Sequence, residues 1–80
     1  MMAADLLDRM RRNPAADWTI ADVEKACRDH GLLFRAGKGS HCHAKHPAAT
    51  EILTIPARRP IKPVYIRKLV HYIEAHGGAR

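Results

Sequence analysis

The fold of this 80-residue chain is decided by residues 32–56, LLFRAGKGSHCHAKHPAATEILTIP. Apolar residues here no longer follow the spacing of three and four that marks a helix but alternate with polar ones, and turn residues interrupt the stretch twice. Because the connections are so short, we expect an antiparallel meander with one covered face and one wet face. The predicted strands are residues 32–36, 40–45 and 51–56.

The alternation also assigns side chains to the two faces of the predicted sheet. In the middle strand, small apolar residues alternate with polar and basic ones, so His41, His43 and Lys45 lie together on the wet face. In the third strand, Leu53 and Ile55 face inward. Pro56 ends the pairing because proline cannot donate to the next strand.

Helical spacing frames this stretch on both sides. Thr19 is predicted to be an N-cap with Asp22 completing a capping box, and Gly31 ends that helix. A last helix begins near Pro63 and closes at Gly77-Gly78. The side chains expected to be buried on these two helices are Ile20, Val23, Ala26, Cys27, Ile66, Leu69, Val70 and Ile73.

A short helix over residues 3–12 precedes these elements. Its apolar side chains are Leu6, Leu7 and Met10, and Asn13-Pro14 ends it. The sequence therefore predicts one α+β domain over residues 1–80 in the order α-α-β-β-β-α. Its architecture is a two-layer sandwich, in which a three-stranded antiparallel sheet packs on helices.

Size and composition limit the class of protein. With 46% hydrophobic and 28% charged residues the chain is globular, and a domain of this length has a thin core without room for a large enclosed pocket. Two cysteines are too few for a disulfide framework. The sequence has neither the run of about 18 apolar residues of a membrane span nor a signal peptide. We therefore expect a cytoplasmic protein with no membrane partner.

Positive charge is concentrated in the middle of the chain. Lys and Arg number 14 against 8 Asp and Glu, and the excess falls in residues 35–68, where Glu51 is the only acidic residue. Such a block attracts polyanions, so nucleic acid is the leading partner class and an acidic protein the second, with a merely solubilising surface as the third reading. The basic residues of the block are Arg35, Lys38, Lys45, Arg58, Arg59, Lys62, Arg67 and Lys68.

Several kinds of chemistry are excluded. The sequence has no P-loop, dinucleotide fingerprint or hydrolase motif, so we expect no nucleotide cofactor. His41, Cys42, His43 and His46 are close in sequence, but in a strand Cys42 points away from the two histidines beside it. His41 and His43 together with His46 could still bind an ion, but we expect such binding to be adventitious and predict no functional metal site. Both Cys42 and Cys27 are expected in the core, where thiols are inert.

An imidazole on a cationic sheet face suits one reaction. His41 follows the turn Lys38-Gly39-Ser40, where glycine lets a substrate approach closely and Lys38 supplies charge. In RNA the 2′-hydroxyl can attack its own neighbouring phosphorus, so a protein need only move protons, orient the sugar and offset the phosphate charge. An unremarkable surface histidine is the competing interpretation.

The surrounding motifs carry a family likeness. Gly37-Lys38-Gly39-Ser40-His41 is followed by His46-Pro47, then by ILTIP at 52–56 and by IKP at 61–63, which leads into IRKL at 66–69. In this order, over residues 18–74, they resemble the HicA family of toxins from bacterial toxin–antitoxin pairs. The resemblance implies a fold like that of double-stranded-RNA-binding domains, endonuclease activity on mRNA and a HicB-like antitoxin as partner. It also implies that His41 is the catalytic residue.

The chain departs from the family pattern in three places. Residues 1–13 add a helix that the shortest members lack. Val64-Tyr65 replaces the more usual Gly-Thr, so we assign no ligand role there. His43 occupies a position that is usually apolar in the family, and it is either a second proton-transfer group or a surface histidine.

The sequence therefore predicts a metal-independent endoribonuclease, the toxin of a type II toxin–antitoxin system. His41 is the general acid or base, and RNA lies across the wet sheet face and the adjoining turns. Ser40 either contacts the substrate or completes its turn. The alternatives are a non-catalytic RNA-binding module and a basic docking module for an acidic protein. The predicted RNA-binding residues are Lys38, Ser40, His43, Lys45, Arg58, Arg59 and Lys62.

Overall fold

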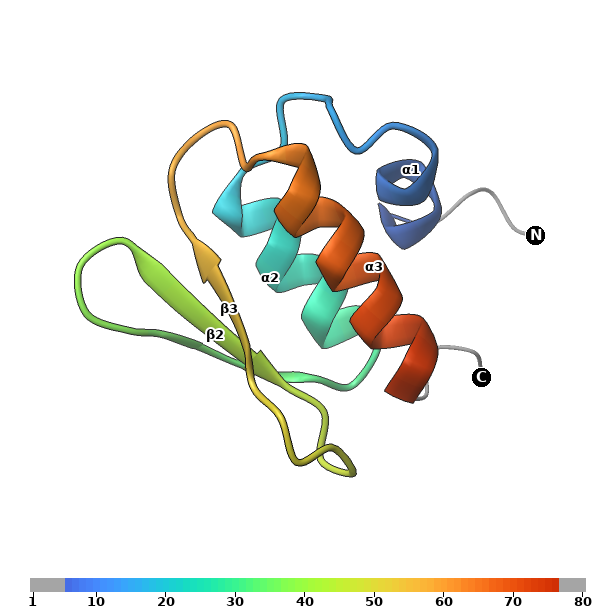
Figure 1. The fold of residues 1–80 in the computed structure, drawn as a ribbon, viewed down its shortest axis with the longest axis vertical. Helices are drawn as coiled ribbons and strands as arrows, with labels where there is room; N and C mark the ends of the chain where they lie inside the picture. The colour runs from blue at the N-terminus through green and yellow to red at the C-terminus, as the bar shows by residue number, and fades with distance from the viewer. Residues whose placement is uncertain (1–5, 77–80) are drawn as a thin grey trace.

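The computed structural model describes residues 6–76, and this part of the chain forms three helices and three strands (Figure 1). Their order confirms the predicted α+β class with the sequence α-α-β-β-β-α. No helix in this part is long and apolar enough to cross a membrane. The elements are α1 (Leu6–Arg12), α2 (Ile20–Asp29), β1 (Leu33–Ala36), β2 (His41–Lys45), β3 (Leu53–Pro56) and α3 (Pro63–His76).

The three strands form an antiparallel sheet in the order β1-β2-β3. Helix α2 contacts β1 and α3 contacts β3, so both helices lie against one face of the sheet (Figure 1). Cys42, Ala44 and Ile55 are buried on that face. The opposite face carries exposed polar side chains, which makes the sheet wet on one side as its alternation predicts.

The core lies between the sheet and the two longer helices. Seven of the eight helical positions predicted to be buried are buried, and Ile20 is half-buried. Tyr72 belongs to the core as well, which helical spacing alone did not indicate. Its hydroxyl donates to the Glu51 carbonyl at 2.7 Å and accepts from the His46 amide at 3.0 Å, so it ties the β2–β3 turn to α3.

Helix α1 packs on the side of the helix pair that faces away from the sheet. It contacts both α2 and α3, and Leu7 and Met10 are buried in that contact. Burying this apolar stripe explains why so short a helix is ordered, since isolated helices of this length are unstable in water. The predicted start of this helix at residues 3–5 and the predicted end of α3 at Gly77-Gly78 lie outside the described residues.

Each strand is shorter than its predicted range, and for β1 the reason lies at Leu32. Its amide donates to the Cys27 carbonyl at 2.8 Å, so the end of α2 uses the hydrogen bond that a longer β1 would need. Gly31 precedes it with φ of +77°, a conformation that glycine adopts without strain. Leu53 was predicted to face inward with Ile55 and is only half-buried, because β3 is an edge strand.

The capping box of α2 gives a first prediction. The Asp22 amide donates to Thr19 Oγ1 at 3.3 Å, and the Thr19 amide donates to Asp22 Oδ2 at 2.9 Å. Thr19→Ala removes one of these bonds and should lower the free energy of unfolding by about 1 kcal/mol in urea titrations. The matched control is Thr50→Ala in an exposed turn. Equal stability of the two variants would contradict a stabilising role for the cap.

Candidate nucleic-acid interface

The wet face of the sheet gathers side chains from all three strands, and we call it the outer sheet face. His41, His43 and Lys45 share it, as predicted from their alternation in β2. Residues directly opposite in the ladder share a face, so Arg35 of β1 and Thr54 of β3 flank His43 there. The sequence pattern did not identify these two neighbours, because strand register becomes visible only in the folded sheet.

His41 is the first residue of β2 and is exposed to solvent. Its backbone closes the hairpin turn: the Gly37 amide donates to the His41 carbonyl at 2.8 Å, and the His41 amide donates to the Lys38 carbonyl at 3.3 Å. Neither ring nitrogen of His41 hydrogen-bonds to a residue within 6–76. The imidazole is therefore held at a defined backbone position and stays available to a ligand.

His43 is half-buried and its ring is fixed at two points. Its Nδ1 lies 3.1 Å from Thr54 Oγ1, within hydrogen-bonding distance. On the other side the ring lies over Gly37, where an added Cβ would come within 2.6 Å of His43 Nε2. Gly37 is thus required for close packing, a role that the sequence analysis did not assign to it.

The loop after β3 meets the hairpin turn. The Ala57 amide donates a hydrogen bond to the Ser40 carbonyl, which brings the start of loop 57–60 against the turn that precedes His41. Arg58 follows directly, and its side chain is exposed, as are those of Lys38 and Ser40. The structure therefore brings the hairpin turn, His41 and the basic loop to one end of the sheet.

Two predicted RNA-binding residues lie in different surroundings. Arg59 forms two hydrogen bonds with Asp17, from Nε to Oδ1 at 3.1 Å and from Nη2 to Oδ2 at 2.7 Å. These bonds hold the pKa of Asp17 below its ordinary value and raise that of Arg59. Arg59 thus joins the loop to the segment before α2. Lys62 caps α3, its carbonyl accepting from the Tyr65 and Ile66 amides, while its side chain is exposed.

The cysteines and clustered histidines are dispersed by the fold. Burial raises the pKa of the Cys42 thiol and raises that of Cys27 to about 12, so both thiols belong to the core, as predicted. His46 Nδ1 accepts from the Ala48 amide at 3.0 Å and shapes the β2–β3 turn. No three His, Cys, Asp or Glu side chains within residues 6–76 are placed to hold one metal ion.

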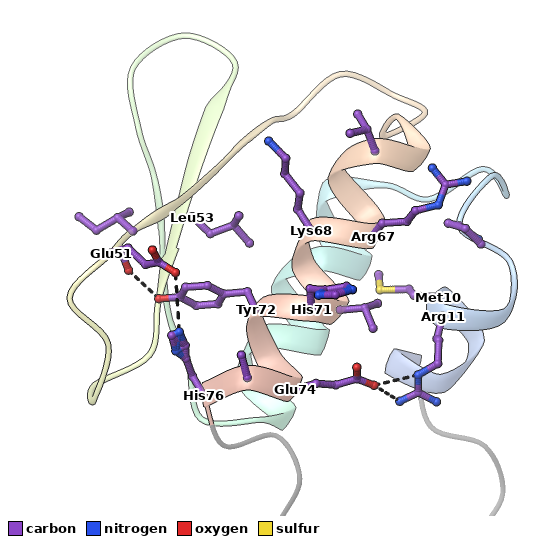
Figure 2. Close-up of a pocket in the computed structure, with 15 residues that line it drawn as sticks. Met10, Arg11, Glu51, Leu53, Arg67, Lys68, His71, Tyr72, Glu74 and His76 are labelled. Atoms are coloured by element: carbon purple, nitrogen blue, oxygen red, sulfur yellow. Dashed lines mark hydrogen bonds and ion pairs between the residues drawn. The ribbon is translucent and has the colours of Figure 1, made fainter.

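A large groove lies elsewhere, along α3 between α1 and residues 51–53 (Figure 2). None of the predicted site residues lines it. Arg67 and Lys68 are exposed on α3 there, and neither forms an ion pair with a residue in the described part of the chain. At the lower end Glu74 is paired with Arg11, whose Nε donates to Glu74 Oε2 at 2.8 Å. We call this the α3 groove.

A smaller hollow lies on the outer sheet face. Its polar lining is His43, Arg35 and Lys45, and its apolar lining includes Leu33 and Ile52, which are 64% and 58% exposed. Ile52 also lines the α3 groove, so the two depressions meet at this residue. The hollow combines an imidazole with two cations, a set that suits a phosphate group.

Fold and surface together define a small α+β domain with an open, cationic sheet face. Comparisons with known proteins give no closer assignment: no family model, curated protein or solved structure matches the chain.

Proposed function

We propose that this protein is a metal-independent endoribonuclease acting on mRNA in the cytoplasm, the toxin of a type II toxin–antitoxin pair like those of the HicA family. One observation carries the proposal: the exposed His41 imidazole, with both ring nitrogens open to a ligand, stands between a glycine turn and a basic loop. A ring packed beneath the helices would have been incompatible with this function.

The proposed reaction uses groups already present in RNA and in this face. The 2′-oxygen attacks the adjacent phosphorus, the bond from phosphorus to the 5′-oxygen breaks, and the products end in a 2′,3′-cyclic phosphate and a 5′-hydroxyl. His41 takes or supplies a proton, which an imidazole does near neutral pH. Lys38 offsets charge on the phosphate, and Arg58 and Lys62 hold the backbone on either side. No step needs a metal ion.

The test is to incubate the purified protein with a long transcript in EDTA. We expect cleavage at defined linkages, and no cleavage of the same transcript carrying 2′-O-methyl groups at those linkages, because the attacking hydroxyl is blocked. RNA that is bound in a salt-dependent way but stays intact would favour the non-catalytic RNA-binding module instead.

The α3 groove favours an additional function, the docking of an acidic protein partner such as the proposed HicB-like antitoxin. Two cations of the groove, Arg67 and Lys68, form no ion pair within residues 6–76, and they stand beside apolar side chains that are exposed, Ile52 and the 47% exposed Val64. A protein segment with carboxylates beside apolar side chains complements this surface in charge and in polarity. RNA would gain little from the apolar part.

Charge reversal tests this docking. Lys68→Glu should weaken binding of a small acidic protein encoded beside this one by about tenfold or more, because it sets like charges against each other. RNA cleavage should stay unchanged. The control is Lys25→Glu on α2, which changes the same charge away from the groove. Equal affinity for both variants in calorimetric titrations would contradict docking in the α3 groove.

A further inference from the structure

We propose that His43 is a second catalytic residue, the general acid that protonates the leaving 5′-oxygen while His41 acts as the base. This inference rests on the proposed endoribonuclease function and deepens it. The leaving oxygen of a phosphodiester departs slowly as an alkoxide, so the reaction needs a proton donor on the side of the phosphorus opposite the 2′-oxygen. Within residues 6–76, His43 is the other imidazole that β2 carries on the outer sheet face.

The spacing of the two histidines fits an in-line displacement. His41 and His43 are two residues apart in β2 and share the outer sheet face. At about 3.3 Å of rise per residue their backbones are about 7 Å apart, a separation on the scale of one phosphodiester. The attacking and leaving oxygens lie on opposite sides of the phosphorus in such a displacement, so each can face its own imidazole.

The surroundings of His43 leave one ring nitrogen for this task. Nδ1 lies 3.1 Å from Thr54 Oγ1, which accepts a hydrogen bond from the Nδ1–H of the protonated ring and fixes the orientation of the ring. Nε2 forms no hydrogen bond with a residue in the described part of the chain. A Cβ at position 37 would come within 2.6 Å of Nε2, so this edge of the ring packs on Gly37 and the leaving oxygen reaches Nε2 from the solvent side of the half-buried ring.

The charge around His43 suits a phosphate. Arg35 stands opposite it in the ladder, and Lys45 is two residues further along the same face of β2. Both cations line the small hollow together with His43. The hollow lies on the side of His43 away from His41, so these cations hold the next phosphate along the RNA strand and keep the reacting phosphodiester between the two imidazoles.

Each proton that moves in this step has a donor and an acceptor. The 2′-hydroxyl proton goes to neutral His41 as the bond from the 2′-oxygen to phosphorus forms. The proton on Nε2 of protonated His43 goes to the 5′-oxygen as its bond to phosphorus breaks. The protein ends with the two protonation states exchanged, and solvent restores them before the next turnover.

The test uses an oligonucleotide that spans a mapped cleavage linkage, made in two forms. In one form the 5′-bridging oxygen is natural, and in the other it is replaced by sulfur, which leaves as a stable thiolate and needs no general acid. Both are cleaved in EDTA by the wild-type protein, by His43→Gln and by the control variant His30→Gln, which changes a histidine at the end of α2.

We expect His43→Gln to slow cleavage of the oxygen substrate by about 100-fold or more and of the sulfur substrate by less than about threefold, with His30→Gln like the wild type on both. Thr54→Val removes the hydrogen bond that orients the His43 ring. It should slow cleavage of the oxygen substrate by a smaller factor and again leave cleavage of the sulfur substrate nearly unchanged. Equal slowing of both substrates by His43→Gln, or no slowing, would overturn the assignment of His43. Failure of the wild-type protein to cut any linkage of the long transcript, the step that precedes this test, overturns the endoribonuclease function itself.

Discussion

Replacing His41 by alanine should lower the rate of RNA cleavage by about 100-fold to 10,000-fold, the usual contribution of a general acid or base. The fold should be unaffected, because the side chain is exposed and makes no hydrogen bond to a residue in the described part of the chain. The measurement is single-turnover cleavage of a labelled transcript in EDTA, with circular dichroism of the variant as the check on folding. In cells the variant should no longer arrest growth.

The matched control is His30→Ala, which removes a histidine from the end of α2 and leaves the outer sheet face untouched. It should cleave RNA like the wild type. A folded His41→Ala protein that retains more than about a tenth of the wild-type rate would contradict the catalytic assignment. Measuring RNA-binding affinity distinguishes a catalytic role of His41 from a role in binding alone. A residue that only binds RNA would change affinity and cleavage rate together.

Leu69→Ala should destabilise the domain by about 2–5 kcal/mol. Leu69 is fully buried on α3 and belongs to the cluster that joins the helices to the sheet. The free energy of unfolding of a small domain lies toward the lower end of about 5–15 kcal/mol. A loss of this size therefore leaves a substantial fraction of the protein unfolded. The change in the free energy of unfolding is measured by urea titration. The fluorescence of Trp18, which is buried and is the single tryptophan, monitors the unfolding.

Val64→Ala is the control for this substitution because Val64 lies on the same helix with 47% of its surface exposed. It should change stability by less than about 1 kcal/mol. A Leu69→Ala protein as stable as Val64→Ala would show that α3 does not hold the core as described.

The parts of the fold that depend on local pattern could be predicted from the sequence. Two-residue alternation placed His41, His43 and Lys45 on one face, and the structure confirms it. The capping box at Thr19 and the helical spacing in α3 were equally visible, because each depends on residues a few positions apart. Strand ends were predicted less well, since Leu32 is engaged by the end of α2.

Features that depend on contacts distant in sequence could not be predicted. The partner of Arg59 is Asp17, 42 positions away, and no sequence pattern indicates that pair. The same holds for Thr54 beside His43, which only strand register reveals, and for the α3 groove, which arises where α1 meets α3. The roles of the site residues in catalysis and RNA binding remain predictions.

The chemical ends of the cleaved RNA test the central claim most directly. Transcripts cut by the wild-type protein in EDTA should carry a 2′,3′-cyclic phosphate, or the monophosphate that follows from its opening, on the upstream fragment and a 5′-hydroxyl on the downstream fragment. Of these ends, the cyclic phosphate requires attack by the RNA's own hydroxyl, the reaction for which an imidazole suffices. A 5′-phosphate on the downstream fragment would contradict the account, because it requires attack by water and departure of the 3′-oxygen.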